Sequence, residues 1–234
     1  MKVNFKQIES ALKGAGFRVS RNKWSADYIS SLFNVDTVID IGVANGTPEL
    51  YDTRISKKLI LVDPQPVPES LTSQLRAGGF QLTCVQAAVG EEAGETELFV
   101  HANPDHSSLL SRTAPFAAIN SKVETATSVP IQPLDKIVEA LDEDPGRVGL
   151  KIDTEGFEPS VLRGAEGTLE KCEFVIIETS LKRRFDPAYP PSEVIGLMHK
   201  NGFEILDILN QEYRTPKFLD ILFARWSGEY FNRP

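Results

Sequence analysis

Short apolar runs rich in β-branched residues alternate with helix-forming segments over most of this chain, and that alternation limits the fold more than any other feature. Runs that lack a polar face are typical of parallel strands buried on both sides. We expect such strands at residues 37–41, 59–62, 80–85, 148–153 and 174–178.

Helix signals lie between these runs. Thr47, Pro48 and Glu49 have the residue types of an N-cap, a first helical position and an acidic first turn, so we expect a helix to begin there. Further helices are expected at residues 67–77, 134–141, 157–170 and 192–201. The strands expected at 203–209 and 218–226 are joined by a short loop, which predicts an antiparallel hairpin. The predicted fold is therefore α/β, with a doubly wound, mostly parallel seven-stranded sheet and helices on both faces.

Two segments fall outside the alternation. Residues 3–34 show helical spacing of apolar positions and predict two short helices that cap the main domain. Residues 94–131 predict two strands, 96–101 and 123–131, with a polar loop between them. We expect this β insertion to lie over the mouth of the sheet. The expected division is a helical cap over 1–34 and one domain over 35–234.

Charge and composition exclude several classes of function. A chain of 234 residues suits one α/β domain, and its net charge of −8 disfavours general binding to nucleic acid or to an anionic membrane. No apolar run approaches the 18 residues of a membrane span, and residues 1–10 lack a secretory apolar core. We therefore expect a cytoplasmic protein.

The two cysteines, Cys84 and Cys172, lie in apolar runs and are interpreted as core residues, because two thiols form neither a disulfide framework nor a zinc cluster. The basic run at residues 182–184 is interpreted as a solvated loop. The alternative reading of this run is a contact to an anionic substrate.

The first strand ends in an acid–glycine turn, and the second strand ends in another acid. Asp40, Gly42, Ala44 and Gly46 have acid-x-Gly-x-small-x-Gly spacing, which lets the backbone approach a ligand closely. Thr at position 47 breaks the third-glycine spacing of a dinucleotide fingerprint, so NAD is disfavoured. Asp63 lies 23 residues after Asp40, where a carboxylate can bind both ribose hydroxyls of an adenosine. The pair predicts a nucleoside site, although each aspartate alone could instead cap a turn.

Acids also gather at the ends of the fourth and fifth strands. Asp153, Glu155 and Glu178 are expected at the mouth of the site, where clustered carboxylates serve proton transfer, metal binding or recognition of a polyhydroxylated substrate. Helix-start charge is the alternative for Glu155 and is favoured for Glu158. His106, in the inserted loop, is a further candidate base, with a solvated loop residue as its alternative. His101 and His199 are interpreted as surface residues.

These residues together resemble FkbM-type methyltransferases, a branch of the class I enzymes that use S-adenosylmethionine (SAM). The resemblance covers roughly residues 36–180. It is strongest over Leu150-Lys151-Ile152-Asp153-Thr154-Glu155-Gly156-Phe157-Glu158 and the following Val161-Leu162-Arg163-Gly164-Ala165. Further matches are Ala87-Ala88-Val89-Gly90, Ser107-Ser108-Leu109, Val129-Pro130-Ile131 with Leu134-Asp135, and Ile176-Ile177-Glu178. Two positions depart from the family pattern, since Asn45 lies one place late in the first loop and Asp63 replaces the usual glutamate.

The resemblance implies a Rossmann-like methyltransferase fold and transfer of a methyl group from SAM to a hydroxyl of a sugar, glycan or natural product. It implies a cofactor site at Asp40, Gly42, Ala44, Asn45, Gly46, Asp63 and Ala87, and catalytic candidates at Asp153, Glu155, Glu178 and His106. No metal ligand is predicted, although three acids could hold a divalent cation. The acceptor is expected to be a small molecule or carbohydrate. The alternatives are a non-catalytic SAM- or nucleoside-binding module and, less favoured, a nicotinamide-dependent oxidoreductase.

Overall fold

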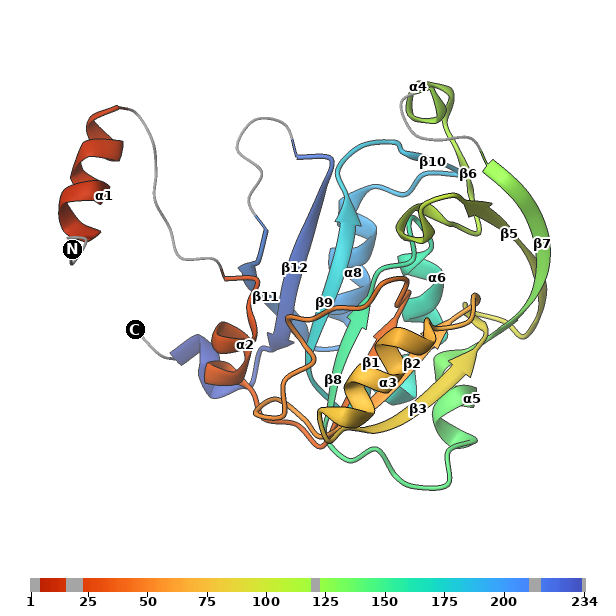
Figure 1. Ribbon diagram of the computed structural model, residues 1–234, viewed down its shortest axis with the longest axis horizontal. Coiled ribbons are helices and arrows are strands. Elements are labelled where there is room, and N and C mark those ends of the chain that lie inside the picture. The colour runs from red at the N-terminus through yellow and green to blue at the C-terminus, as the bar shows by residue number, and fades with distance from the viewer. Residues whose placement is uncertain (1–4, 16–22, 119–122, 211–215, 233–234) are drawn as a thin grey trace.

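The computed structural model describes residues 5–15, 23–118, 123–210 and 216–232. Its centre is a seven-stranded sheet in the order β11-β12-β9-β8-β1-β2-β3 (Figure 1). Only β12 runs antiparallel to its two neighbours, whereas the other pairings are parallel. The strands are β1 (Thr37–Ile41), β2 (Lys58–Asp63), β3 (Gln81–Gln86), β8 (Val148–Ile152), β9 (Cys172–Ser180), β11 (Phe203–Ile208) and β12 (Phe218–Arg225). The predicted mixed sheet and its closing hairpin are confirmed.

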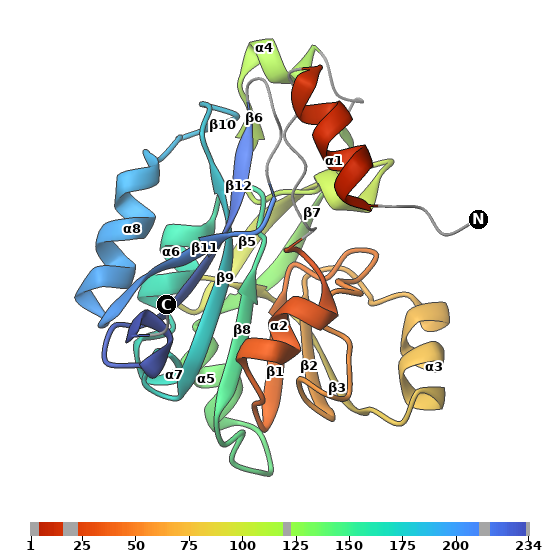
Figure 2. The same ribbon diagram turned by 90° about the vertical axis from the view of Figure 1, so that its left-hand side faces the viewer.

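Helices cover both faces of this sheet, as the apolar strands require. On one face, Ile29 of α2 and Leu75 of α3 belong to one buried cluster, and on the other face α5, α6, α7 and α8 contribute to a second cluster. Figure 2 shows α3 on one side of the sheet and α6, α7 and α8 on the other. These helices are α2 (Ala26–Leu32), α3 (Glu69–Ala77), α5 (Leu134–Glu139), α6 (Glu158–Arg163), α7 (Glu166–Glu170) and α8 (Pro191–Lys200).

The β insertion is also present and lies above the carboxyl ends of the central strands (Figure 1). Its strands β4, β7 and β5 form a three-stranded sheet, and β6 pairs with β10 to form a second small sheet. The elements are β4 (Ala88–Val89), β5 (Gly94–His101), η1 (Pro104–His106), β6 (Ser111–Arg112), α4 (Ala114–Ala117), β7 (Val123–Gln132) and β10 (Phe185–Asp186). Because β10 follows β9, the β6–β10 pairing ties the insertion to the main sheet.

Two predicted helices are wrong in detail. No helix begins at Thr47, because the segment folds into separate turns, with the N–H of Leu50 bonded to Thr47 O and that of Ile55 to Asp52 O. Leu50 and Ile55 are fully buried by these turns. The helix predicted over 157–170 is divided into α6 and α7 at Gly164, where an added Cβ would lie 2.0 Å from Gly90 O. The close approach of these two backbones therefore ends α6.

The N-terminal segment contains the two expected helices, α1 (Phe5–Gly14) and α2. Phe33, next to α2, packs on Phe174 of the sheet, with ring centroids 4.7 Å apart. Figure 1 shows α1 apart from the sheet, and the domain boundary near residue 35 remains a prediction. The last element, η2 (Glu229–Asn232), packs beside α2 through Tyr230, whose ring lies 4.7 Å from that of Phe33.

Three expected burial states are tested by the structure. Cys172 is buried as expected, but Cys84 is exposed because β3 is the outermost strand on its side of the described sheet. His101, the last residue of β5, is only 5% exposed and so is not the predicted surface residue. Among the described residues, no helix is both long and apolar enough to cross a membrane.

Candidate functional site

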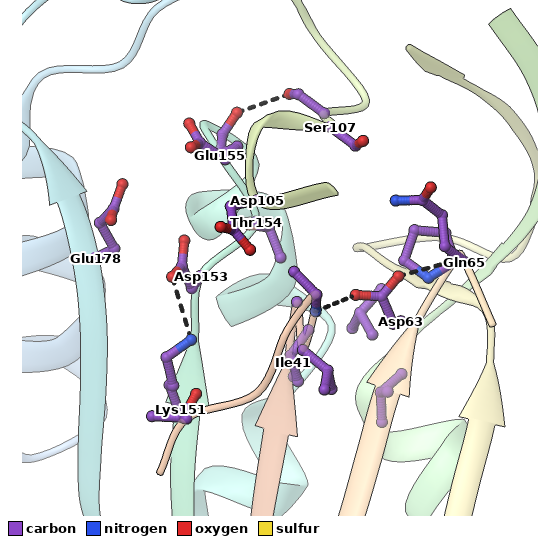
Figure 3. Close-up of a pocket in the computed structure, with 18 of the residues that line it drawn as sticks. Ile41, Asp63, Gln65, Asp105, Ser107, Lys151, Asp153, Thr154, Glu155 and Glu178 are labelled. Carbon is purple, nitrogen blue, oxygen red and sulfur yellow. Dashed lines mark hydrogen bonds and ion pairs between the residues drawn. The ribbon is translucent and has the colours of Figure 1, made fainter. Parts of the chain in front are cut away.

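A cleft of about 360 Å³ opens where the carboxyl ends of β1, β2 and β8 meet the inserted loop. This volume lies within the roughly 300–1,000 Å³ of small-molecule sites, and the position is the one that ligands occupy in open α/β sheets. Figure 3 shows the cleft from the side, with the three strands ending below it. Six of the seven predicted cofactor residues line it, namely Gly42, Ala44, Asn45, Gly46, Asp63 and Ala87.

The turn after β1 is held in an unusual backbone conformation. Gly42, Ala44 and Gly46 have φ values of +78°, +43° and +96°. An added Cβ on Gly42 would lie 1.7 Å from Asp153 O, so the turn passes directly against the segment after β8. Only glycine fits this contact, which presents main-chain groups of the turn to the cleft.

Asp63 fixes this turn from the end of β2. Its Oδ2 accepts a hydrogen bond from the Ala44 N–H at 3.0 Å, and its Oδ1 accepts one from the Gln65 N–H at 2.7 Å (Figure 3). Burial raises the pKa of Asp63, against the effect of these N–H groups, which lower it. Since each carboxylate oxygen can accept two hydrogen bonds, Asp63 retains acceptor capacity toward the cleft.

Asp40 lies below the cleft and does not line it. It is fully buried, its Oδ2 accepts a hydrogen bond from Tyr51 Oη at 2.6 Å, and its Oδ1 lies 3.6 Å from Lys151 Nζ. That Oδ1 has no hydrogen-bond partner among the described residues. Lys151 lines the cleft directly above. Asp40 therefore reaches the cleft through Lys151 and does not make the direct contact that the sequence predicts.

Asp153 and Lys151 face the cleft from the end of β8. Lys151 Nζ donates a hydrogen bond to Asp153 Oδ2 at 3.2 Å (Figure 3), as expected for side chains two residues apart on one strand. The Asp153 side chain is 29% exposed, against 10% for Glu155 and 12% for Glu178. Of the three predicted acids, Asp153 is thus the most accessible to a ligand.

Glu155 and Glu178 share one buried cation. Arg184 Nη2 is paired with Glu155, and Arg184 Nη1 donates to Glu178 Oε1 at 2.9 Å. Arg112 Nη2 lies 3.7 Å from Glu155 Oε2. Burial raises the pKa of Glu155 to about 7, opposed by Arg184, and burial with the nearby charges of Asp153 and Glu155 raises the pKa of Glu178. These carboxyls therefore hold protons more readily than ordinary glutamates.

Glu158 has a structural role in the turn between β8 and α6. Its Oε1 accepts hydrogen bonds from the N–H of Thr154 and of Gly156, and its Oε2 accepts one from Tyr189 Oη at 2.6 Å. Glu158 is 1% exposed, so it is not the solvent-exposed acid at a helix start that the sequence favours. By fixing this turn, Glu158 positions Asp153 and Glu155.

A second cavity of about 290 Å³ adjoins the first and shares Asp105, Asp153, Glu155 and Glu178 with it. His106 lines only this second cavity, and burial lowers its pKa, so its neutral form is favoured. The remaining lining residues are Phe116, Arg184, Lys217 and Phe218. All four catalytic candidates therefore meet here, and the insertion forms one wall.

Sequence reasoning missed three site residues. Arg184 is buried in an ion pair, whereas the sequence predicts a solvated loop at residues 182–184; its neighbours Lys182 and Arg183 are exposed, as expected. Tyr51 binds Asp40, and Asp220 of β12 lines the cleft. The sequence feature that could have identified Arg184 is the cluster of three strand-end acids, for which no cationic partner is predicted.

The first cleft fits a cationic nucleoside such as SAM, whose sulfonium and ammonium groups outweigh its single carboxylate. Seven carboxyl side chains line it, and Lys151 is its one cationic lining residue among those the structure describes. The acids are Glu49, Asp63, Asp105, Asp153, Glu155, Glu178 and Asp220. Within the described ranges, no group of three or more His, Cys, Asp or Glu residues is arranged to hold a metal ion.

The mostly parallel seven-stranded sheet with one antiparallel strand is a Rossmann-like fold, and the acid-lined cleft lies at the carboxyl ends of its strands. The chain belongs to the FkbM methyltransferase domain family, whose model matches residues 40–205, well over half of the sequence. It is a methyltransferase whose cofactor is SAM. A search of curated proteins finds no match.

Solved structures of other methyltransferases resemble this chain more distantly. A proposed tRNA (m1A22) methyltransferase from Streptococcus pneumoniae is 13% identical with a TM-score of 0.48, over 88% of this chain and 70% of that one. The magnesium protoporphyrin IX methyltransferase of Synechocystis PCC 6803, with bound SAM, is 11% identical with a TM-score of 0.42, over 96% and 86%. The 1,6-didemethyltoxoflavin-N1-methyltransferase of Burkholderia thailandensis is 12% identical with a TM-score of 0.43, over 94% and 86%. With TM-scores below 0.5, none of the three bears on the acceptor of this chain.

Proposed function

We propose that this chain transfers the methyl group of SAM to a hydroxyl oxygen of a sugar, glycan or other natural-product acceptor. The observation that carries the proposal is the shared wall of the two cavities, where Asp153, Glu155 and Glu178 face both spaces. A donor in the first cavity and an acceptor in the second would meet at these carboxyls. When bound, SAM supplies a methyl group that its positively charged sulfur has already activated.

Binding of the donor is assigned to the first cavity. Asp63 would accept hydrogen bonds from the ribose hydroxyls, and the main chain of the turn at residues 42–46 would lie against the ligand. Lys151 would attract the carboxylate of the donor, since its ammonium group lies at the cleft floor. Asp40 would hold Lys151 in place from below.

Asp153 is assigned as the general base. It is the most exposed of the three acids, and Lys151 Nζ lies 3.2 Å from its Oδ2. Its carboxylate would take the proton of the acceptor hydroxyl as the oxygen gains the methyl group. A positioned base of this kind contributes about 10²–10⁴-fold to rate, and alignment of the two reactants contributes roughly 7–11 kcal/mol.

Glu155, Glu178 and His106 are assigned to acceptor binding and positioning. Glu178 is held by Arg184 Nη1 at 2.9 Å, so we assign it to binding of the acceptor and not to proton transfer. Arg184 fixes both glutamates, so their oxygens present a rigid polar wall to a polyhydroxylated acceptor. We also expect the protein to act in the cytoplasm on a small molecule or carbohydrate and not on nucleic acid.

The test is a methyl-transfer screen with isotope-labelled SAM against sugar, polyketide and phenolic hydroxyls, run with and without EDTA. We expect labelled product, and we expect Asp153→Asn to lower turnover by about 10²-fold or more while SAM affinity changes little. Asp186→Asn, at an exposed position of β10, is the matched control and should keep wild-type turnover. Wild-type turnover in Asp153→Asn would exclude Asp153 as the general base. SAM binding without methyl transfer to any acceptor would favour a non-catalytic binding module.

A further inference from the structure

Part of the wall of the first cavity comes from outside the residues that the family model matches. Trp24, just before α2, and Asp220 of β12 both line this cavity, whereas the model matches residues 40–205. Membership of the family therefore assigns neither residue a role. Trp24 is also the single aromatic side chain among the described residues that line the cavity.

The segment that carries Trp24 is fixed to the main sheet on both sides of this residue. Lys23 Nζ lies 2.8 Å from Asp207 Oδ2 of β11, and Tyr28 Oη donates to the same oxygen at 2.5 Å. Ser25 caps α2, since its Oγ accepts a hydrogen bond from the Tyr28 N–H at 3.3 Å. Trp24 thus reaches the cavity from a segment held at the β11 side of the sheet.

Trp24 and Asp63 belong to opposite ends of the cavity. Three strands, β9, β8 and β1, lie between β12, which carries Asp220, and β2, which carries Asp63. At about 4.8 Å per strand, these two walls are roughly 19 Å apart. Ala87 follows β3, on the far side of β2. A donor with its ribose at Asp63 and its adenine toward Ala87 therefore extends its sulfonium and amino-acid end toward Trp24.

Carboxyl groups gather at the Trp24 end of the cavity. Burial, together with the nearby charges of Asp153 and Glu49, raises the pKa of Asp220, against the effect of Lys151, which lowers it. All four of these residues line the cavity. An indole next to several carboxyls favours a cation, because the face of an aromatic ring attracts positive charge and tryptophan does so most strongly.

We propose that Trp24 packs its ring against the sulfonium group of SAM and so favours the methyl donor over the demethylated product. When the methyl group leaves, its bonding electron pair stays on the sulfur, which becomes neutral in S-adenosylhomocysteine (SAH). The attraction of the ring for a cation is then lost, whereas contacts to the ribose and adenine are the same in both molecules. The proposal rests on the donor site assigned under the proposed function.

Fluorescence tests the contact directly, because the chain has two tryptophans, Trp24 and Trp226. Trp226 is 65% exposed and follows the end of β12, which runs antiparallel to β9, so it lies at the end of the sheet away from the cleft. Trp226→Phe therefore leaves Trp24 as the only emitter. We expect its emission to change on titration with SAM and to saturate at the affinity that calorimetry gives. Trp24→Phe, which retains only Trp226, is the matched control and should show no change.

Calorimetry with SAM and with SAH separates contact with the sulfonium from contact elsewhere on the ligand. Trp24→Leu should lower the affinity for SAM about fivefold more than the affinity for SAH, because a neutral sulfur has no cationic attraction to lose. Trp24→Phe should keep part of the preference for SAM, since it retains an aromatic ring. Trp226→Leu is the matched control and should leave both affinities at the wild-type values.

Unchanged Trp24 emission at saturating SAM, or equal losses of SAM and SAH affinity in Trp24→Leu, would overturn the proposal. The first measurement leaves Trp24 in place, so it does not depend on the folding of a Trp24 variant. SAM binding without methyl transfer to any acceptor would overturn the proposed function alone, because both readouts here report binding of the donor.

Discussion

The main-chain N–H of Ala44 donates a hydrogen bond of 3.0 Å to Asp63 Oδ2, and this bond joins the turn after β1 to the end of β2. Ala44 has a φ of +43°, a conformation that costs an alanine energy and needs support from its surroundings. Asp63 provides that support and also lines the cleft. One carboxylate thus shapes the turn and is available to the ligand.

The first prediction concerns this carboxylate. Asp63→Ala should weaken SAM binding by about 10- to 100-fold, because a hydrogen bond to a charged group contributes roughly 1.5–3 kcal/mol. Isothermal titration calorimetry measures the change. Asp142→Ala, an exposed aspartate in the loop before β8, is the control and should bind SAM as wild type does. Equal affinity in both variants would exclude Asp63 from the site.

The second prediction compares two glycines. Gly42→Ala should lower the free energy of unfolding by about 2 kcal/mol or more, because the new Cβ would lie 1.7 Å from Asp153 O and the backbone has a positive φ. Gly196→Ala, inside α8 with no atom near its added Cβ, should raise that free energy by about 0.5–1 kcal/mol. Urea unfolding gives both values, and a tolerated Gly42→Ala would contradict the close backbone contact.

The third prediction concerns the buried cation. Arg184→Ala should destabilise the protein by about 3–5 kcal/mol, because it leaves Glu155 and Glu178 buried without their shared partner. Arg183→Ala changes an exposed neighbour and should alter stability by less than about 0.5 kcal/mol. Thermal unfolding of the pair is the measurement. Similar melting temperatures would show that the ion pair is not formed in solution.

The fourth prediction is a pH dependence. Burial, reinforced by Asp153, raises the pKa of Asp220 from 3.8 to about 7. Between about pH 4 and pH 7 the folded chain holds a proton that the unfolded chain has released. The free energy of unfolding therefore falls as the pH rises through this range. The loss is at most about 1.4 kcal/mol per pH unit for one group.

Asp220→Asn should flatten this part of the stability profile, measured by urea unfolding from pH 4 to 8. Glu155, whose pKa is raised to about 7, contributes in the same direction, so some slope should persist. Asp142→Asn, at the exposed loop position, should keep the wild-type slope. An unchanged slope in Asp220→Asn would show that its carboxyl is ionised in the folded protein.

The sequence predicted the sheet well because its strands are defined by local composition. Strand β1, for instance, is apolar on both faces except for Thr37 and Asp40, and its boundaries at residues 37–41 are as expected. The helices were less predictable where tertiary contacts override propensity. Gly164 divides α6 from α7 because Gly90 lies against it, a contact between residues 74 positions apart that no local pattern shows.

The sequence predicts which residues gather at the site, but it does not predict how deeply each of them is buried. Glycine spacing and strand-end acids located the cleft, since parallel strands bring their carboxyl ends to one edge. Whether an acid lines the cleft or lies beneath it depends on long-range partners. Asp40 is covered because Tyr51 and Lys151 reach over it, and Arg184 is buried because Glu155 and Glu178 neutralise it.

The position of β12 has a consequence for how the protein is made. This strand follows every other strand in the sequence, yet it lies between β9 and β11. While the ribosome is still translating the preceding residues, β9 and β11 have no common neighbour, and Asp220 is missing from the cleft wall. A chain halted before residue 218 would therefore lack both Asp220 in the cleft wall and the strand that joins β9 to β11, so the cleft is complete only once β12 has been made.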